Sequence, residues 1–527
     1  MRLYALLFAI FLSLDAYKIL VYSNLFGHSH VKMLGSVADI LTDAGHNVTV
    51  LMPIIDVNER NRTGLKSTKN LVMVEANEKT KEMYNQLKDF MSNVWIIQQS
   101  NPFAIISKAV DMAKMFSIPC INVLSQKDLI QKFKDENFDL ALTEPFDLCG
   151  YAFFDAIQVP AHVSVLASSR LDHVSEALGQ PAAASYVPGA QSVYTDRMNI
   201  KERFLNLLQV FAGGKLFSYI ADYEYRELQK IDPKTRSWRD IMPESTFVFT
   251  NNIPILDFPA PTFDKIIPIG GISVVTDKKK NALPEKWNKV LSLRKKTILI
   301  SFGSNAKSVQ MPEEFKQSFL KVFNMMPDVT FIWKYEEENS KIVDHLDNVF
   351  LGTWLPQNEL LADKRLTVFL THGGLASTTE LAVLGKPCIM VPLFADQARN
   401  AKMLERHGGA IVLDKTDLSN PEKIKKTFEE ILNNDSYRKH AERVAEMLNN
   451  QPANPRETFV KHVEFAARFG RMPSMEPYAR HQSFIEHFFL DIIAIALLVV
   501  ITVTTVSFLV LRCLLRRICG SAKVKSE

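Results

Sequence analysis

Residues 367–380 read TVFLTHGGLASTTE, and this stretch decides the fold class of the chain. Thr367–Leu370 is a short apolar run, which predicts a buried strand. The strand runs into Thr371-His372-Gly373-Gly374, and we expect a helix to begin near Ala376. A strand followed by glycines and a helix N-terminus presents free backbone N–H groups and the positive end of a helix dipole to an anion. The stretch therefore predicts an anion site at the end of a strand.

Similar strands recur along the whole chain. In the second half we expect strands at 297–301, 329–334, 349–354, 367–371, 387–393 and 410–413, most of them separated by helical segments. In the first half we expect strands at 18–23, 47–51, 138–143 and 162–166, with a helix over about 30–44. Apolar strands that alternate with helices are typical of parallel sheets covered on both faces. The pattern predicts an α/β fold class, with two doubly wound, Rossmann-like domains facing a cleft.

Two further segments between these strands have distinctive compositions. The charged stretch at 276–281 favours a solvated linker over a binding patch. The segment from about 200 to 228 is helical in pattern and unusually apolar. We interpret it first as helical core or a domain interface; the alternative is a wall for an apolar ligand or a contact with a membrane surface.

Polar residues at the strand ends are suited to a nucleotide diphosphate. Ser304 follows a strand and a glycine, so its hydroxyl can meet a phosphate at close range. His372 and Ser377 add donors beside Gly373 and Gly374.

Other strand-end residues are suited to the nucleoside and the sugar. Trp354 offers a flat ring for a base, and Gln357 an amide for its edge or for ribose. Glu380, one turn into the helix, can accept ribose hydroxyls, whereas Asp396 and Gln397 suit sugar hydroxyls.

Missing motifs and composition exclude several classes of protein. The chain has no Gly-x-Ser-x-Gly nucleophile elbow, no Gly-x-Gly-x-x-Gly fingerprint, no phosphate-binding P-loop and no Asp-x-Asp pair. With 62 basic and 58 acidic residues, the net charge of +4 is too small to favour a nucleic-acid-binding protein. Five cysteines in 527 residues exclude a disulfide scaffold, and 47% hydrophobic residues exclude a mostly disordered chain.

Both ends of the chain indicate a secretory-pathway membrane protein. Arg2 and the apolar run from Leu3 to Leu14 predict a signal peptide over residues 1–16. Residues 492–511 contain no charge, and twenty helical residues span about 30 Å, the thickness of a hydrocarbon core. Basic residues follow this segment, which places the tail at 512–527 in the cytosol and the body in the lumen. The terminal Lys-Val-Lys-Ser-Glu resembles a retrieval signal for the endoplasmic reticulum.

Between Trp354 and Gln397 the chain resembles the signature of the UDP-glycosyltransferase family, in its membrane-bound UDP-glucuronosyltransferase branch. The matching residues are Trp354, Gln357, Thr371, His372, Gly373, Gly374, Ser377, Glu380, Pro387, Pro392, Asp396 and Gln397. The resemblance implies a GT-B fold with an acceptor domain at 17–276, a linker at 277–296 and a UDP-sugar domain at 297–453. It also implies a helical return segment at 454–487, a transmembrane helix at 488–511 and the basic tail at 512–527.

The resemblance also implies an inverting transfer of a hexosyl group, glucuronosyl or glucosyl, from a UDP-sugar to a hydroxyl of a small lipophilic acceptor, as in detoxification. The family's base falls on His30, ahead of the Gly45-His46 pair, and its partner carboxylate on Glu144, where aspartate is commoner. Asp147 lies close enough in sequence to serve instead, and His28 is expected at the surface. No metal or cofactor is implied, because the UDP-sugar is a co-substrate.

Several alternatives stay open from the sequence. A catalytically inactive member that binds ligands or partners at the membrane is one, and a dehydrogenase-like nucleotide enzyme, disfavoured by the missing glycine fingerprint, is another. The donor, UDP-glucuronate or UDP-glucose, is not fixed, and neither is homo- or hetero-oligomeric assembly. Sequons at Asn61 and Asn434 are expected on loops, and the one at Asn47 in a buried strand.

Overall fold

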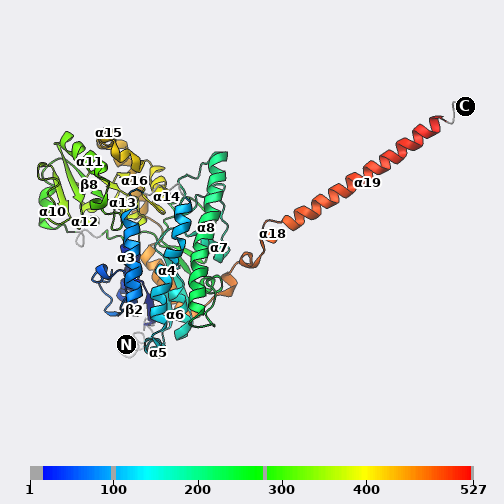
Figure 1. The fold of residues 1–527 in the computed structure, drawn as a ribbon, viewed down its shortest axis with the longest axis horizontal. Coiled ribbons are helices and arrows are strands. Elements are labelled where there is room, and N and C mark those ends of the chain that lie inside the picture. The colour runs from blue at the N-terminus through cyan, green and yellow to red at the C-terminus, as the bar shows by residue number, and fades with distance from the viewer. Residues whose placement is uncertain (1–15, 97–101, 277–281, 524–527) are drawn as a thin grey trace, which may run out of the picture. The chain divides into compact units, whose positions relative to one another are not determined.

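The computed structural model describes residues 16–96, 102–276 and 282–523 (Figure 1). Apart from Ala16, the predicted signal peptide lies outside these residues, as do the last four residues of the predicted retrieval signal. The chain divides into two compact units, one up to Glu476 and one from Pro477 onward.

The first sheet contains seven parallel strands in the order β3-β2-β1-β4-β5-β6-β7. Its strands are β1 Lys18–Tyr22, β2 Asn47–Pro53, β3 Asn70–Val74, β4 Leu140–Thr143, β5 His162–Leu166, β6 Val248–Thr250 and β7 Ile266–Pro268. The helices of this half are α2 His28–Asp43, α3 Glu78–Ser92, α4 Pro102–Leu124, α5 Lys127–Asp135, α6 Cys149–Ile157, α7 Asp172–Leu178, α8 Ile200–Gln229 and α9 Trp238–Ile241. The strand order reverses between β1 and β4, so their carboxyl ends open a crevice.

The second sheet contains six parallel strands in the order β10-β9-β8-β11-β12-β13. Its strands are β8 Lys296–Ser301, β9 Val329–Lys334, β10 Val349–Gly352, β11 Val368–Thr371, β12 Cys388–Met390 and β13 Ala410–Val412. Its helices are α10 Glu285–Val290, α11 Glu313–Met325, α12 Gln357–Ala362, α13 Leu375–Leu384, α14 Gln397–Glu405, α15 Pro421–Asn433 and α16 Asp435–Asn449. Here the order reverses between β8 and β11. The prediction of two doubly wound parallel sheets is confirmed.

Each sheet is buried between two layers of helices because its strands are apolar on both faces. In β1, Ile19 packs with residues of α2, whereas the next residue, Leu20, packs with α4, α5 and α6. In β8, Ile298 packs with α11 and α15, and Leu299 with α10 and α13. Burying alternate residues on opposite faces fixes the register of each strand, since a one-residue slip would exchange the two faces.

Segments of the chain outside the two sheets connect the two halves. Ile253, Leu256 and Phe258 lie before the predicted linker but pack in a core of the second half, as does Trp287 within that linker. After α16, helix α17 Pro455–Phe469 returns to the first half, where its Phe459 is fully buried in the same core as α2.

Helix α8 departs from the interpretation as helical core in its first half. Ile200, Phe204 and Phe211 are 78%, 59% and 65% exposed, whereas Ile220 and Leu228 toward the end of the helix are buried. The core interpretation is therefore wrong for the first half of α8, and a contact with an apolar ligand or a membrane stays a prediction.

The three sequons begin at exposed asparagines. Asn61 and Asn434 are exposed, as expected. The sequon at Asn47 begins strand β2, which is mostly buried as expected, although Asn47 itself is exposed and Thr49 is half-buried. The first residue of a strand lies at the rim of the sheet, where water reaches it.

The second unit, from Pro477, contains α18 Phe484–His487 and the long helix α19 Leu490–Lys523. An 18-residue stretch within Leu490–Ile518 of α19 has a mean hydropathy of 2.8, and α8 is the other helix in the described chain long and apolar enough to cross a membrane. The helix extends beyond the predicted span at 488–511 into the basic tail.

Candidate functional site

His30 and Glu144 meet at the crevice of the first sheet. Their strands, β1 and β4, are neighbours, so the residues that follow the two carboxyl ends come together. His30 lies in the first turn of α2, and its Nδ1 is 2.7 Å from Oε2 of Glu144. The other carboxylate oxygen of Glu144 accepts a hydrogen bond of 2.9 Å from the backbone N–H of Ala167. Glu144 is thus held from both sides and fixes the orientation of the imidazole.

The electrostatic surroundings of His30 favour its protonated form. Burial disfavours the imidazolium, but the nearby Glu144 carboxylate, together with Asp396 of the second half, outweighs burial and raises the pKa of His30 above its usual 6.5. A carboxylate only accepts hydrogen bonds, so Nδ1 of the neutral ring donates to Glu144 and the lone pair lies on Nε2. His30 is therefore oriented to take a proton at Nε2.

Asp147, the alternative partner from the sequence, does not face His30. Its Oδ2 accepts from Nδ2 of Asn24 at 2.6 Å, and its Oδ1 accepts from the backbone N–H of Cys149 at 2.8 Å. Burial raises the pKa of Asp147 to about 7, and the charge of Glu144 adds to the shift. Through these hydrogen bonds Asp147 fixes the start of α6, whereas Glu144 is the carboxylate that contacts the His30 imidazole.

The other two histidines near α2 occupy different surroundings. His46 is buried at the far end of α2, with Nε2 3.4 Å from Glu464 of α17. His28 was expected at the surface, and this expectation is wrong: its ring lies edge-on to Trp354, with 5.1 Å between centroids. Burial and the charges of Lys32, Arg62 and Lys334 lower the pKa of His28 to about 4.

The crevice of the second sheet holds the predicted anion site. Strands β8 and β11 are neighbours, which places Gly303 against the His372-Gly373-Gly374 turn. A Cβ at Gly303 would lie 2.6 Å from Cε1 of His372, and one at Gly374 would lie 2.8 Å from its Nε2. Both glycines are therefore needed to seat the imidazole, and Gly303 also has a φ of 82°.

His372 is neutral at neutral pH. Burial, with a smaller effect of the Lys334 charge, lowers its pKa to about 4. The ring can therefore donate one hydrogen bond to a phosphate but brings no full charge. Gly374 caps α13, so the free N–H groups of that helix begin next to the ring.

Gln357, Ser377 and Glu380 form one hydrogen-bonded group on α12 and α13. Nε2 of Gln357 donates to Oγ of Ser377 at 3.0 Å and to Oε2 of Glu380 at 2.7 Å. Oε1 of Glu380 lies 2.6 Å from Nζ of Lys32, which comes from α2 in the first half. Sequence reasoning missed Lys32, because a lone lysine near a helix start resembles any solvated side chain.

Trp354, the predicted base platform, is 43% exposed and carries two cations over its ring. The guanidinium of Arg62 lies 4.1 Å from the ring centroid and Nζ of Lys334 lies 4.9 Å from it. Nζ of Lys334 also donates to the backbone oxygen of Gly303 at 2.6 Å. Arg62 and Lys334 had no distinguishing signal in the sequence.

Asp396 and Gln397 differ in what they offer to a ligand. Burial raises the pKa of Asp396, and its Oδ2 accepts from Nδ2 of Asn400. The side chain of Gln397 turns inward, where Oε1 accepts from the backbone N–H groups of Leu393 and Phe394 at 2.8 and 3.0 Å. Asp396 and Gln397 therefore do not offer two equivalent oxygens to a sugar in this structure, because the amide oxygen of Gln397 already accepts two backbone hydrogen bonds.

Most of these residues line one hollow of about 1050 Å³. The predicted site residues along it are Ser304, Trp354, Gln357, His372, Gly374, Ser377 and Glu380. His28, Ser29 and Lys32 line it from the first half. Among the residues that the structure describes, no group of three or more His, Cys, Asp or Glu side chains could hold a metal ion.

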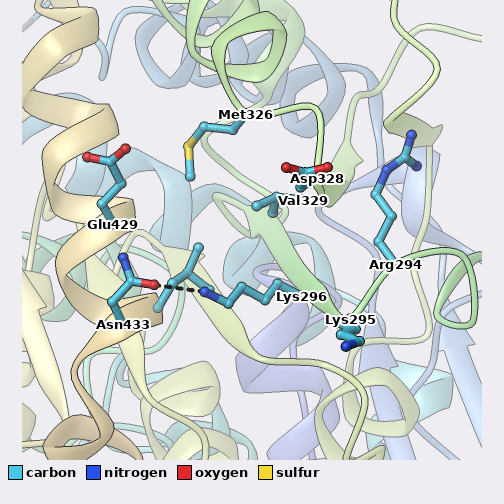
Figure 2. Close-up of a pocket in the computed structure, with 9 residues that line it drawn as sticks. Arg294, Lys295, Lys296, Met326, Asp328, Val329, Glu429 and Asn433 are labelled. Atoms are coloured by element: carbon cyan, nitrogen blue, oxygen red, sulfur yellow. Dashed lines mark hydrogen bonds between the residues drawn. The ribbon is translucent and has the colours of Figure 1, made fainter.

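A separate hollow of about 510 Å³ lies at the amino ends of the second sheet (Figure 2). Lys296 and Val329, which begin β8 and β9, line it with Arg294 and Asn433. Lys296 donates to Asn433 at 2.8 Å. Because α/β sheets bind ligands beyond the opposite, carboxyl ends of their strands, we assign no function to it.

Comparison with known proteins bears on the family and the fold of the chain. Residues 17–525 match the family model described as "UDP-glucoronosyl and UDP-glucosyl transferase". Caenorhabditis elegans ugt-47 is 27% identical over 91% of this chain and 89% of its own length, and human UDP-glucuronosyltransferase 1A8 is 25% identical over 91% and 88%. Among solved structures, Phytolacca americana UGT2, complexed with UDP-2fluoro-glucose and pterostilbene, shares the fold with a TM-score of 0.55 at 15% identity, covering 86% of this chain and all of that one.

Proposed function

The chain belongs to the UDP-glucuronosyl and UDP-glucosyl transferase family and is a UDP-glycosyltransferase with a GT-B fold, and on that premise we propose how it works. It transfers a glucuronosyl or glucosyl group from a UDP-sugar to a hydroxyl of a small lipophilic acceptor, with inversion and without a metal. The observation that carries the proposal is the hydrogen bond between His30 and Glu144. It lies at the crevice of the first half, and the predicted anion site lies in the second half.

In the proposed reaction His30 is the general base. Nε2 takes the proton of the acceptor hydroxyl while the oxygen attacks the anomeric carbon, and the bond from that carbon to the UDP oxygen breaks. Direct displacement inverts the anomeric centre and needs no covalent enzyme intermediate. Glu144 stabilises the imidazolium that forms, because it already accepts the hydrogen bond from Nδ1.

The residues of the second half bind the donor. The start of α13, with His372, Ser377 and Ser304, stabilises the departing diphosphate. Trp354 stacks with uracil and Gln357 contacts its edge or the ribose. The list of proposed donor-binding residues is completed by Gly373, Gly374, Glu380, Asp396 and Gln397.

The proposed location is the membrane of the endoplasmic reticulum, with a single span and the catalytic halves in the lumen. The apolar helix α19 supports the anchor. A disulfide joins Cys120 of α4 to Cys149 of α6, and stable disulfides are typical of oxidising compartments such as that lumen. The exposed apolar residues of α8 offer a second contact with the membrane or a path for a lipophilic acceptor.

The test of the reaction uses the full-length protein in membranes, with radiolabelled UDP-glucose or UDP-glucuronate and a panel of phenols. A radiolabelled phenol glycoside of inverted configuration, formed equally well in chelator, is expected from one or both donors. UDP binding without any product would instead support the inactive, ligand-binding alternative. A chelator-sensitive rate would overturn the metal-independent mechanism.

The location has its own test. A chain that ends before residue 512 should leave the endoplasmic reticulum, because it lacks the predicted retrieval signal, and should keep its activity. Full retention of the truncated chain would show that the tail is not the determinant.

A further inference from the structure

Lys32 brings a positive charge from the first half into the predicted donor site of the second. Its Nζ lies 2.6 Å from Oε1 of Glu380, although 348 residues separate the two. The side chain of Glu380 is only 4% exposed, whereas that of Lys32 is 34% exposed. The ammonium thus lies at a buried carboxylate, and the Lys32 side chain lines the hollow.

The geometry of α2 separates Lys32 from the base. Successive residues of a helix are about 100° apart, so Lys32 and His30 project about 200° apart around α2. His30 contacts Glu144 within its own half, and Lys32 contacts Glu380 in the other. One helix start therefore serves both the base and the donor side of the cleft.

Lys32 also lies close to the groups proposed to hold the diphosphate. Gln357 donates to both Ser377 and Glu380, and Lys32 approaches the other oxygen of the same Glu380 carboxylate. Ser377 and Glu380 are three residues apart on α13, less than one helical turn. Lys32 lines the same hollow as Ser304, His372 and Gly374.

The diphosphate site of the second half is poor in full positive charge. His372 is uncharged at neutral pH, and a helix N-terminus supplies only about half a charge. The ammonium of Lys334 is engaged by the backbone oxygen of Gly303 and lies 3.6 Å from Glu336. A departing diphosphate gains negative charge as the glycosidic bond breaks, so a cation beside it would speed that step.

We propose that Lys32 is a donor-binding residue, whose ammonium pairs with the diphosphate of the UDP-sugar while Glu380 holds the side chain in place. The inference rests on the proposed function and adds a residue from the acceptor half to the donor site. A diphosphate bound in this way would contact residues of both halves, and donor binding would therefore draw the two halves together.

The test separates a contact with the diphosphate from a role in holding Glu380. The dissociation constants of UDP and uridine are measured by titration on the full-length protein, and the ratio between them reports the diphosphate alone. In Lys32→Gln the preference for UDP over uridine should fall about tenfold or more, the usual range for a lost charge-assisted hydrogen bond. Lys32→Arg should retain most of the preference for UDP over uridine. Lys69→Gln, with the same change of charge at an exposed lysine of the same half, should leave it unchanged.

Three outcomes would overturn the proposal. Equal weakening of UDP and uridine would mean that Lys32 only positions Glu380. Tighter binding of both would mean that it blocks the ribose site. Weakening confined to UDP-glucuronate, with UDP and UDP-glucose unaffected, would assign Lys32 to the sugar carboxylate. A wild-type protein that binds UDP but transfers no sugar would overturn the proposed function and leave the affinity comparison valid.

Discussion

Nδ1 of His30 lies 2.7 Å from Oε2 of Glu144, across 114 residues of sequence. The contact arises because β1 and β4 are adjacent at the point where the strand order of the first sheet reverses. The winding of the sheet thus sets the proposed base and its carboxylate on the two sides of one crevice.

Replacing His30 by alanine should separate catalysis from donor binding. Turnover should fall roughly 10²–10⁴-fold, the usual contribution of a positioned general base. UDP affinity should hardly change, because the His30 side chain contacts Glu144 in its own half and none of the proposed nucleotide-binding residues. Initial rates and UDP titrations test this, with the exposed His345→Ala as control. A near-normal rate with a phenol acceptor would refute the assignment.

The pH dependence of the rate should reveal the effect of Glu144 on the pKa of His30. A general base acts when neutral, so kcat/KM should rise with pH through the raised pKa of His30, above 6.5. In Glu144→Gln the attraction is lost and the pKa of His30 falls, so the acid limb should move to lower pH while the plateau drops about 10²-fold or more.

The matched variant for this profile is Asp147→Asn. Asp147 binds Asn24 and the start of α6, so its substitution should leave the position of the acid limb nearly unchanged. A larger shift in Asp147→Asn than in Glu144→Gln would transfer the carboxylate role to Asp147.

His372→Ala should weaken both UDP binding and the rate. In the proposed site the neutral ring donates to phosphate in the ground state as well as in the transition state, so removing it should cost about 0.5–1.5 kcal/mol of UDP affinity. Since the pKa of His372 is about 4, the loss should be constant between pH 6 and 8. A loss that grows toward pH 6 in calorimetric titrations would show that the ring binds as a cation.

The disulfide between Cys120 and Cys149 should stabilise the first half. It joins α4 to α6 across 29 residues, and such a cross-link contributes about 2–4 kcal/mol by constraining the unfolded chain. Cys120→Ser/Cys149→Ser should lower the unfolding temperature and abolish its sensitivity to reductant. Cys513→Ser, at an exposed free thiol, is the control. Equal unfolding temperatures with and without reductant in the wild type would contradict the prediction.

Asp39 should also stabilise the fold of the first half. Its carboxylate accepts hydrogen bonds from the backbone N–H groups of Lys66, Ser67 and Thr68 at 2.7, 3.0 and 2.9 Å. Asp39→Asn leaves one oxygen for three donors, and we expect a loss of about 2–4 kcal/mol in the free energy of unfolding. Asp43→Asn, one turn along the same helix and exposed, should change it little in chemical denaturation. Equal effects of the two variants would refute the role of Asp39.

Local sequence patterns were sufficient for the strands of the second half, for four strands of the first and for the residues that follow them, but β3, β6 and β7 were not predicted. Val329–Lys334 and His162–Leu166 form the strands predicted for them, because short apolar runs between helices have one stable place, the interior of a parallel sheet. The role of the glycines after β8 and β11 was equally predictable from the sequence. Where the backbone approaches a ligand or a ring closely, there is no room for a side chain.

The family resemblance added what local pattern could not supply. Nothing in the spacing of His30 and Glu144 reveals that they touch, and Asp147 lies close enough in sequence to serve instead of Glu144. The resemblance selected the pair on which the structure shows a hydrogen bond.

The sequence by itself determined most of the strands, the family to which the chain belongs and the apolar helix near its end, but it did not predict β3, β6 and β7. Only the tertiary structure decided that His28 lies against Trp354, that the amide oxygen of Gln397 is turned inward and that Lys32 reaches Glu380. Strands and helices follow from periodic patterns of apolar residues close together in the chain. A contact between single polar side chains depends on how two sheets and their helices pack, and a lone lysine or histidine leaves no periodic trace of its distant partner.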